Sequence, residues 1–457
     1  MGRRTGSAGH PDIGQLASTG DLQSVSGWKQ QLNMGNEGSS FKPHSGLAPS
    51  ELEKLRQSFC GSAGRQLWPP WTDVFQQEQQ ALLVRALSDQ KGIVSFEKYQ
   101  QLAGEVGKGS VESRAQFLIL MSGTNTEENL TTDSVKKGIL VILQAFCRTL
   151  PHKSALGITG LNHCLLFAES LLHDFVFKNQ KRKNTFSKTQ GIADMSKEDV
   201  ENLLLQHPII ENVLIEVLNC CFQVKFKQQI LLPSLSEDQT SLSPIQILYL
   251  NHHLPHELRS IWRPLFNTDT HGESFSKLLG SITGQGPSLL IVWDETGNIF
   301  GGFATDSWKP GPKFYGAAES FLFHLHPKMN VYDSTPFNQN YQYLNIKQKT
   351  MPNGLGMGGQ LDYFGFWLDS EFGLVRTSPT CSTFHSAQLS AQSEGRIRRL
   401  EVVGLGERKL LGPDETERSV LDLDTEAQAI MEMMGKTFHS KVIREVDEEA
   451  DKKRDQK

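Results

Sequence analysis

The sequence predicts a protein of the α+β class, in which an all-α module precedes a domain with a central antiparallel β-sheet and a C-terminal helix follows. Three observations indicate this class. Apolar residues recur at helical spacing through residues 50–225, two-residue alternation replaces that spacing after Pro233, and an amphipathic helical pattern returns near the chain end. Because 457 residues exceed what one hydrophobic core supports, we expect two folded domains.

Composition divides the chain into four parts. Residues 1–49 are dominated by Gly, Ser, Gln, Asn and Lys, and their few large apolar groups predict a flexible segment. We expect the helical module at 50–232, the sheet domain at 236–408, and a linker with an amphipathic C-terminal helix at 409–457.

Charge and cysteine content narrow the class of protein. Forty-six basic and fifty-one acidic residues give a formal charge of -5, so no global basic field attracts nucleic acid. The six cysteines match neither a zinc ribbon nor a small disulfide framework, which indicates reduced thiols in a cytosolic protein.

No stretch approaches the roughly 18 to 20 apolar residues of a membrane-spanning helix. The first residues also lack the apolar core of a secretory signal, so we expect a chain that is neither secreted nor membrane-spanning.

The helical module is predicted to begin at Ser50, where Ser-Glu-Leu-Glu is typical of a helix start. Two further sets of apolar residues predict helices, because they keep a spacing of about 3.6 residues. The first set is Val135, Ile139, Leu143 and Phe146, and the second, on both sides of Pro208, is Leu203, Leu204, Leu214, Ile215 and Leu218.

The loop at 87–99 predicts a degenerate EF-hand. Gly92 takes the place of the sharp turn and Val94 that of the buried β position. Most metal ligands are missing, since Lys98 stands where a chelating carboxylate is required and Asp89 is the one carboxylate among the ligand positions. Because a Lys ammonium repels a cation, we predict an EF-hand-like scaffold that does not hold Ca²⁺.

The sheet domain is predicted from alternating apolar residues and turn sequences. Leu289–Trp293 and Ile299–Thr305 flank the turn sequence Asp294–Gly297 and predict a β-hairpin. Three more strands are predicted at Phe321–His326, Tyr363–Leu368 and Leu400–Val403. Helices at Pro244–Leu250 and Leu258–Phe266 are predicted to lead into this sheet.

Three ordered blocks of this half carry a family resemblance. They are Pro264–Ala304, then FLFHLHPKMNVYD, then PNGLGMGGQLDYFGFWLDSEFGLVRTSPTCSTF. Together they resemble the TLDc-domain family over about a third of the chain, and their ordered co-occurrence is more specific than any single block. The resemblance implies the TLDc fold for residues 236–408.

Within the TLDc family, the combination of a lipidation motif, an EF-hand-like region and a helical tail resembles a branch associated with mTOR at the lysosome. This resemblance implies a non-catalytic adaptor that supports mTOR signalling, growth and proliferation at the cytosolic face of the lysosomal membrane. Its implied partners are mTOR signalling proteins and the vacuolar proton pump. TLDc domains are also associated with oxidative-stress resistance, so a protective redox or hydrolytic enzyme stays as the alternative.

The string MGNEGS at Met34–Ser39 fits the N-myristoylation pattern, with Gly35 as the acceptor if translation starts at Met34. The upstream start at Met1 does not fit, because Gly6 stands where Ser or Thr is required. A single myristoyl chain binds membranes only marginally, so we expect protein partners to supply a second contact.

Three reactive side chains were candidates for catalysis. Cys381 with His385 would form a thiolate pair and Glu319 would act as a base, yet none lies in a recognised nucleophile motif. We therefore assign no catalytic residue.

The sequence also contains patterns that mimic cofactor and metal sites. Gly354–Gly359 satisfies G-x-G-x-x-G, but it precedes an aromatic strand instead of opening a helix. His324 and His326 share a face of a predicted strand without a third ligand. We predict neither a cofactor nor a metal site there, nor at His252, His253 and His256.

The tail beyond residue 409 predicts one amphipathic helix. Thr425–Gln428 is a capping box, and apolar residues then recur on one helix face, at Ile430, Met433, Met434, Phe438, Val442 and Val446. Adaptable Met side chains suit docking to a partner, and packing on the chain's own domain is the equal alternative.

Overall fold

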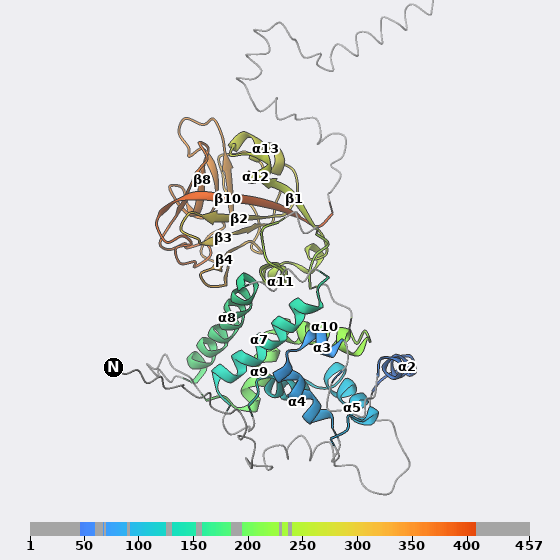
Figure 1. Cartoon of the computed structure of the whole chain (residues 1–457). Coiled ribbons are helices and arrows are strands. Elements are labelled where there is room, and N and C mark those ends of the chain that lie inside the picture. The colour runs from blue at the N-terminus through green and yellow to red at the C-terminus, as the bar shows by residue number, and fades with distance from the viewer. Residues whose placement is uncertain are drawn as a thin grey trace, which may run out of the picture. The chain divides into compact units, whose positions relative to one another are not determined.

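The computed structural model describes residues 46–59, 67, 70–88, 92–124, 130–151, 158–183, 194–227, 231–235 and 240–407. They fall into two compact units (Figure 1). The helical unit comprises residues 1–233, 241–254 and 327–330, and the sheet unit comprises 234–240, 255–326 and 331–457. The α+β class is thus confirmed, whereas the exact domain boundaries stay predictions. Residues 1–45 of the predicted flexible segment and the predicted C-terminal helix lie outside the described residues.

The described part of the helical unit consists mainly of α-helices. In chain order they are α2 (Pro49–Ser58), α3 (Trp71–Val74), α4 (Gln77–Leu87), α5 (Phe96–Gly107), α6 (Val111–Met121), α7 (Thr132–Thr149), α8 (Ile158–Lys183), α9 (Lys197–Gln206), α10 (Pro208–Phe222) and α11 (Pro244–His253). The predicted start at Ser50 falls in the first turn of α2, where the Glu51 carboxylate accepts a hydrogen bond from Ala48 N at 2.7 Å.

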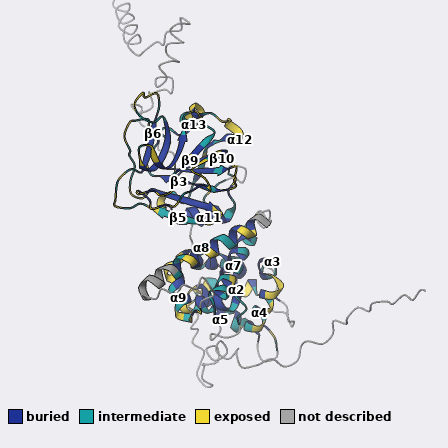
Figure 2. Cartoon of the chain, turned by 90° about the vertical axis from the view of Figure 1, so that its left-hand side faces the viewer, coloured by how far each residue is buried: buried dark blue, intermediate teal, exposed yellow. Residues whose placement is uncertain are grey.

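Helix α7 lies at the centre of this unit and packs against α3, α6, α8 and α10 (Figure 2). Its residues Val135, Ile139, Leu143 and Phe146 are all buried, so the predicted helix and its buried face are confirmed. Pro208 begins α10, where its missing N–H removes no helical hydrogen bond. The break predicted between α9 and α10 is therefore confirmed as well.

Arg114 ties three helices of the unit together. Its Nε donates to the carbonyl of Val106 at 3.0 Å and its Nη2 to that of Gly107 at 3.4 Å, both at the end of α5. Its Nη1 lies 2.9 Å from Glu211 Oε1 on α10. A buried guanidinium is tolerated here because carbonyls and a carboxylate replace the water that it loses.

Helices α4 and α5 flank the loop that was predicted to be EF-hand-like. Gly92 has a φ of 76°, which suits a sharp turn, and buried Val94 forms a bridge with Ser88. Lys98 Nζ donates to the Ser88 carbonyl at 2.5 Å. Residues 89–91 lie outside the described ones, so the EF-hand-like description stays a prediction.

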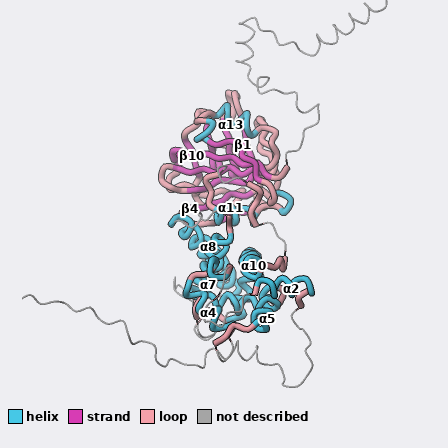
Figure 3. Tube along the Cα trace, turned by 45° about the vertical axis from the view of Figure 1, so that its right-hand side comes forward, coloured by secondary structure: helices cyan, strands magenta, loops and turns pink. Residues whose placement is uncertain are grey.

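Among its described residues, the sheet unit contains ten strands and three short helical segments. Figure 3 shows the strands gathered in this unit. The strands are β1 (Trp262–Asn267), β2 (Ser288–Asp294), β3 (Ile299–Ala304), β4 (Phe321–His326), β5 (Asn330–Asp333), β6 (Gln342–Asn345), β7 (Gly354–Gln360), β8 (Tyr363–Asp369), β9 (Leu374–Thr377) and β10 (Glu394–Leu405). The helical segments are η4 (His256–Leu258), α12 (Thr268–His271) and α13 (Phe275–Ile282). The predicted hairpin is confirmed as β2–β3, and the three other predicted strands as β4, β8 and part of β10.

The sheet closes over one hydrophobic core. The strand order is β5-β4-β3-β2-β10-β9-β8-β7-β6, with β1 also paired to β10. Although β3 and β7 are far apart in this order, a Cβ on Gly302 of β3 would lie 2.6 Å from Met357 Sδ of β7. The two ends of the sheet therefore face each other, and their inner side chains form a single buried cluster.

The helix predicted at Leu258–Phe266 is wrong. Residues His256–Leu258 form a single 3-10 turn, and Trp262–Asn267 form strand β1, which pairs with β10 among the described strands. Pro264 explains the difference, because a helix interior needs the N–H that proline lacks whereas an edge strand tolerates its absence. Buried Trp262 and Phe266 are four residues apart, a separation that fits both a helix and a two-residue alternation.

The β2–β3 turn is held by Asp294, a carboxylate that is 1% exposed. It accepts hydrogen bonds from Ser390 Oγ at 2.7 Å, Thr296 Oγ1 at 2.8 Å, Asn298 N at 2.8 Å and Asn298 Nδ2 at 2.9 Å. Burial alone would raise the pKa of the Asp294 carboxyl, but these hydrogen bonds outweigh burial and hold the pKa below its usual value. Asp294 thereby fastens the β9–β10 loop to the hairpin.

Asp294→Asn should destabilise the sheet unit by about 2 kcal/mol at pH 7, because the amide cannot accept all four hydrogen bonds. Because the pKa of Asp294 is lower in the folded state than its unfolded value of 3.8, the ionised carboxylate stabilises the fold at pH values above 3.8. This stabilisation is lost as the pH falls through the folded-state pKa. The difference between wild type and variant should therefore shrink below about pH 4. Urea unfolding followed by tryptophan fluorescence at pH 7 and pH 3 measures it.

Glu295→Gln is the matched control, since Glu295 is exposed in the same turn. Its effect should stay within about 0.5 kcal/mol at both pH values. If Asp294→Asn lowered the free energy of unfolding equally at pH 7 and pH 3, the assigned role of the carboxylate would be contradicted.

Candidate functional site

The glycine-rich run Gly354–Gly359 forms strand β7, between β6 and β8, and not a phosphate-binding loop. A Cβ on Gly356 would lie 2.7 Å from Phe364 Cδ1 and 2.8 Å from Trp367 Cε3. Such distances are too short for any side chain, so the two rings rest directly on the backbone of β7. Glycine at position 356 thus permits the close approach of aromatic rings to the strand.

These rings form an aromatic cluster on the outer side of β6–β8, with Tyr343, Phe364 and Trp367 buried and Phe314 packed against them. Phe364 and Trp367 stack with centroids 4.4 Å apart, and Phe314 lies 5.2 Å from Tyr343 and 5.7 Å from Phe364. Tyr343 Oη donates to the Pro352 carbonyl at 3.1 Å, and burial raises the pKa of its phenol. The four rings therefore form a rigid apolar surface, which is the floor of the cleft that opens beside it.

A cleft of about 680 Å³ opens to solvent beside this cluster, and we name it the aromatic cleft. It is lined by Pro312, Lys313, Phe314, Tyr315, Gly316, Gln339, Asn340, Gln360 and Leu361. Three segments far apart in sequence therefore build it: the loop before β4, the loop before β6, and the β7–β8 turn.

Backbone hydrogen bonds fix the walls of the aromatic cleft. Tyr315 and Gln342 exchange N–H···O bonds of 3.0 and 2.9 Å, and Gly311 N donates to the Leu344 carbonyl at 2.8 Å. On the other side, Asn340 Nδ2 donates to the Gly359 carbonyl at 2.7 Å. The loop 311–315 thus covers the free edge of β6, which removes an exposed sheet edge and holds the cleft open.

The chemistry of the aromatic cleft is that of recognition. Lys313 is the charged residue in its lining, beside three side-chain amides and two aromatic rings. The Tyr315 Oη accepts from Lys309 N at 3.0 Å, and burial raises the pKa of Tyr315 well above its usual value. Phe337 and Tyr363, 78% and 66% exposed, lie two residues from the lining in sequence. Exposed aromatic and amide groups around a preformed cleft suit binding of a polypeptide.

The three candidate catalytic residues do not form a reactive group. Cys381 is 2% exposed, and its Sγ would lie 2.6 Å from a Cβ on Gly358. Burial raises the pKa of its thiol, which disfavours the thiolate. His385 and Glu319 are exposed, and among the described hydrogen bonds none joins either side chain to Cys381.

Of the histidines that the sequence brings close together, His324 is part of the core packing. His324 is 6% exposed, its Nε2 is hydrogen-bonded with the Leu389 carbonyl, and its ring meets Phe300 edge-on at 6.2 Å. His326 is exposed, beyond a break in the β3–β4 register. The rings of His252 and His253 lie 5.4 Å apart at the end of α11. Within the described ranges, no three His, Cys, Asp or Glu residues converge as metal ligands would.

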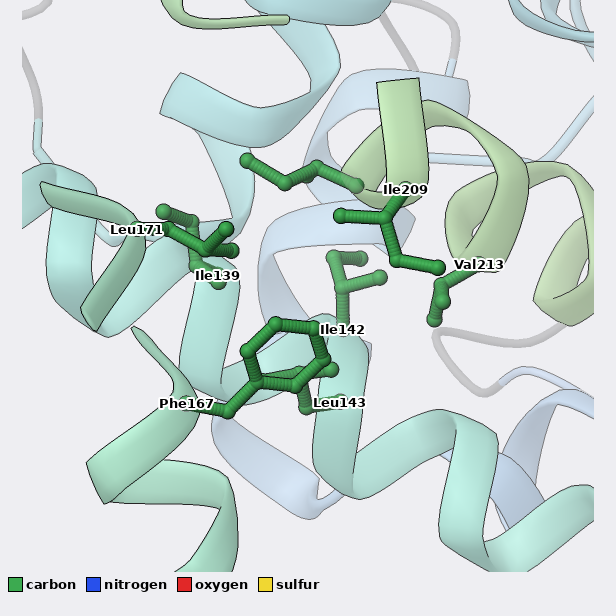
Figure 4. A pocket seen from close by; sticks show the side chains of 8 residues that line it. Ile139, Ile142, Leu143, Phe167, Leu171, Ile209 and Val213 are labelled. Carbon is green, nitrogen blue, oxygen red and sulfur yellow. The ribbon is translucent and has the colours of Figure 1, made fainter. Parts of the chain in front are cut away.

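The helical unit has a cavity of about 10 Å³ between α7, α8 and α10, which is much smaller than the aromatic cleft of the sheet unit (Figure 4). Only apolar side chains line it, among them Ile142, Phe167 and Val213. A space of this size holds at most one water molecule and offers it no hydrogen bond, so this cavity is a packing void.

No described helix is long and apolar enough to cross a membrane. Gly35 lies outside the described residues.

Sequence reasoning assigned no role to the residues of the aromatic cleft. No single segment carries a recognisable motif, and proximity arises only when the sheet closes. The run KPGPKFYG at 309–316 was the one available signal, because proline and glycine beside two aromatic residues are typical of an ordered functional loop.

Comparison with known proteins gives consistent similarities. The family model of the TLDc domain matches residues 235–406. The chain is 35% identical over 459 residues to mTOR-associated protein MEAK7 of Xenopus laevis, covering 91% of this chain and 99% of that relative. It is 34% identical over 370 residues to the Homo sapiens protein of that name, covering 77% and 80%. Oxidation resistance protein 1 of Rattus norvegicus is 32% identical over 172 residues, covering 37% of this chain and 20% of that relative.

Gly356→Ala should destabilise the sheet unit by about 2 kcal/mol, because the new methyl group overlaps the rings of Phe364 and Trp367. Gly311→Ala is the control: a Cβ there meets no atom within 4 Å, so the effect should stay within about 0.5 kcal/mol. Chemical unfolding followed by tryptophan fluorescence measures both. If Gly356→Ala and Gly311→Ala unfolded at the same denaturant concentration, the rings of Phe364 and Trp367 would not rest on the backbone of β7.

Proposed function

Because the chain belongs to the MEAK7 family of mTOR-associated TLDc-domain proteins, we propose that it is a non-catalytic adaptor supporting mTOR signalling at the cytosolic face of the lysosomal membrane. One observation carries the proposal: the identity to the Xenopus laevis relative extends over 99% of that relative, through the helical unit as well as the TLDc domain. An adaptor acts through the arrangement of its surfaces, and similarity that includes both units supports a role in which both take part. The proposed outcome is support of growth and proliferation signals.

The aromatic cleft is the surface that we assign to partner binding. Its apolar floor is rigid, its walls are fixed by backbone hydrogen bonds, and its rim offers exposed rings and amides. A preformed site of this kind loses little conformational freedom on binding, which favours affinity. mTOR signalling proteins are the proposed partners, and the vacuolar proton pump is a further one that rests on the TLDc resemblance alone.

Membrane placement is proposed to depend on Gly35. In chains initiated at Met34, Gly35 becomes the first residue after methionine removal and is the acceptor of a myristoyl chain. One such chain supports an association constant of only about 10⁴ M⁻¹. Stable residence at the lysosome therefore needs the lipid and a protein partner together.

The alternative function, a protective enzyme of oxidative stress, draws on the likeness of residues in the TLDc domain to oxidation resistance protein 1. The environment of Cys381 does not favour it. A thiol that is 2% exposed and has a raised pKa is neither accessible to a substrate nor ionised at neutral pH. We therefore propose that Cys381 is a core residue.

Gly35→Ala in chains initiated at Met34 should abolish lysosomal co-fractionation, because N-myristoylation requires glycine at the acceptor position. Co-precipitation with mTOR from detergent extracts should persist, since the folded units are unchanged. Gly38→Ala, the same substitution three residues on, is the matched control and should fractionate as wild type. Unchanged membrane fractionation of Gly35→Ala would refute the lipid anchor, and absence of mTOR from all precipitates would refute the adaptor role.

Cys381→Ser should leave peroxide consumption and thiol oxidation by the purified protein at the buffer rate, as in wild type. Spectrophotometric assay of hydrogen peroxide decay measures it. A wild-type rate at least tenfold above buffer that disappears in Cys381→Ser would instead establish the enzyme.

A further inference from the structure

Four arginines gather where β10 leaves β9 and joins β2, and we name them the arginine face. They are Arg376 of β9 and Arg396, Arg398 and Arg399 of β10. Arg396 and Arg398 are exposed, whereas Ile397 between them is buried in the core. The arginine face is therefore the solvent side of the strands whose other side forms the core.

Two of the four guanidinium groups are paired within the sheet unit. Arg376 Nε lies 2.8 Å from Glu394 Oε2, and Arg399 Nη2 lies 2.5 Å from Asp269 Oδ2. Arg399 also lies over the ring of Trp293, with its Cζ 5.9 Å from the centroid. These two arginines are held in place by their partners.

Arg396 and Arg398 differ from their neighbours. Across the described residues, no ion pair joins either of them to a carboxylate. Two further acidic residues lie nearby: Glu295, whose N donates to the Arg396 carbonyl at 3.0 Å, and Asp369, whose charge acts on Arg376. Arg396 and Arg398 are the two exposed arginines left for an anionic ligand.

The β10–β2 register breaks between Ile397 and Arg399, where two residues of β10 advance against one of β2. Arg398 is the extra residue. Bulges of this kind turn a side chain away from the regular alternation. As a result, exposed Arg398 and half-buried Arg399 stand at consecutive positions beside half-buried Trp293, a surface with both charge and an aromatic ring.

The chain itself carries a matching anionic segment shortly after β10. Residues 414–426 hold six carboxylates, at Asp414, Glu415, Glu417, Asp422, Asp424 and Glu426, and one basic residue, Arg418. Leu421 and Leu423 alternate with two of these carboxylates, so an extended conformation would place apolar side chains on one side and acids on the other. This composition complements arginines beside a tryptophan.

The segment is also long enough to reach the arginine face. Arg398 lies seven residues before the end of β10 at Leu405, a distance of roughly 23 Å along a strand. Asp414 follows Leu405 by nine residues, which span up to about 30 Å when extended. Gly406 has a φ of 70°, which suits a chain reversal. If the chain reverses there, Asp414 and the residues after it can lie alongside Arg398 and Arg396.

We propose that the acidic segment 414–426 folds back and binds the arginine face of its own sheet unit, with carboxylates on Arg396 and Arg398. Each exposed ion pair is weak alone, but the short tether gives an effective concentration in the millimolar range, so several pairs form together. The contact covers a cationic surface and holds the predicted helix after Thr425 close to the sheet. Because the charges are exposed, the contact weakens at high salt.

The test uses the full chain with Arg398→Lys, which keeps the charge and supplies an amine that carbodiimide couples to a nearby carboxylate. Mass spectrometry of tryptic peptides should find position 398 linked to residues 414–426. The yield should exceed by at least fivefold the links from Lys347 and Lys349, two exposed lysines of the β6–β7 loop, to the same segment. Raising NaCl from 0.05 to 0.5 M should lower the yield at least fivefold.

Two controls make the result decisive. Asp422→Asn with Asp424→Asn should reduce the links, and a mixture of ¹⁵N-labelled and unlabelled chains should give links within one isotope only. Yields equal to those of Lys347 and Lys349, or links from position 398 to Glu394 and Glu295 alone, would overturn the proposal. Mixed-isotope links would also overturn it, by assigning the segment to a second copy. If Arg398→Lys does not fold, Arg396→Lys provides the same measurement.

Discussion

Strand β10 is the element on which the sheet unit depends, because it pairs with three neighbours in succession. Residues 394–396 pair with β9, residues 397–404 with β2, and residues 401–405 with β1. A strand that serves both halves of a closed sheet has to bend, and the register break at Ile397–Arg399 is where it does so. The same bend exposes Arg398, so the feature that closes the core also shapes the arginine face.

Glycine in β7 is a second constraint, and it shows how far local sequence reasoning extends. The hairpin β2–β3 was predictable because a turn sequence lay between two alternating apolar runs, all within about 20 residues. Likewise, α7 followed from a single periodic pattern. The run Gly354–Gly359 was recognisable as unsuited to a cofactor, but its positive role depends on Phe364 and Trp367 lying flat across the strand. That role requires the pairing of β7 with β8.

Features assembled from distant segments could not be predicted. The aromatic cleft combines residues near 314, 340 and 360, and no property of any one segment signals the other two. The wrong helix at Leu258–Phe266 has a related cause. Trp262 and Phe266 satisfy helical and strand periodicity equally, and only the pairing of β1 with β10 decides between them. Long-range contacts thus determined what local propensity left open.

The distribution of reactive groups bears on the kind of function that the molecule can perform. Asp294, His324 and Cys381 are all buried, and Asp294 is fully engaged in fastening a loop. Besides the Lys313 ammonium and the carboxylates of Glu295 and Glu394, the surface around the aromatic cleft and the arginine face presents amides, aromatic rings and guanidinium groups. These groups recognise polypeptides and carboxylates well, because they offer directed hydrogen bonds and charge without needing to change protonation at neutral pH. A fold that uses Asp294 and Cys381 for internal support, and presents permanent donors around these two surfaces, is suited to binding.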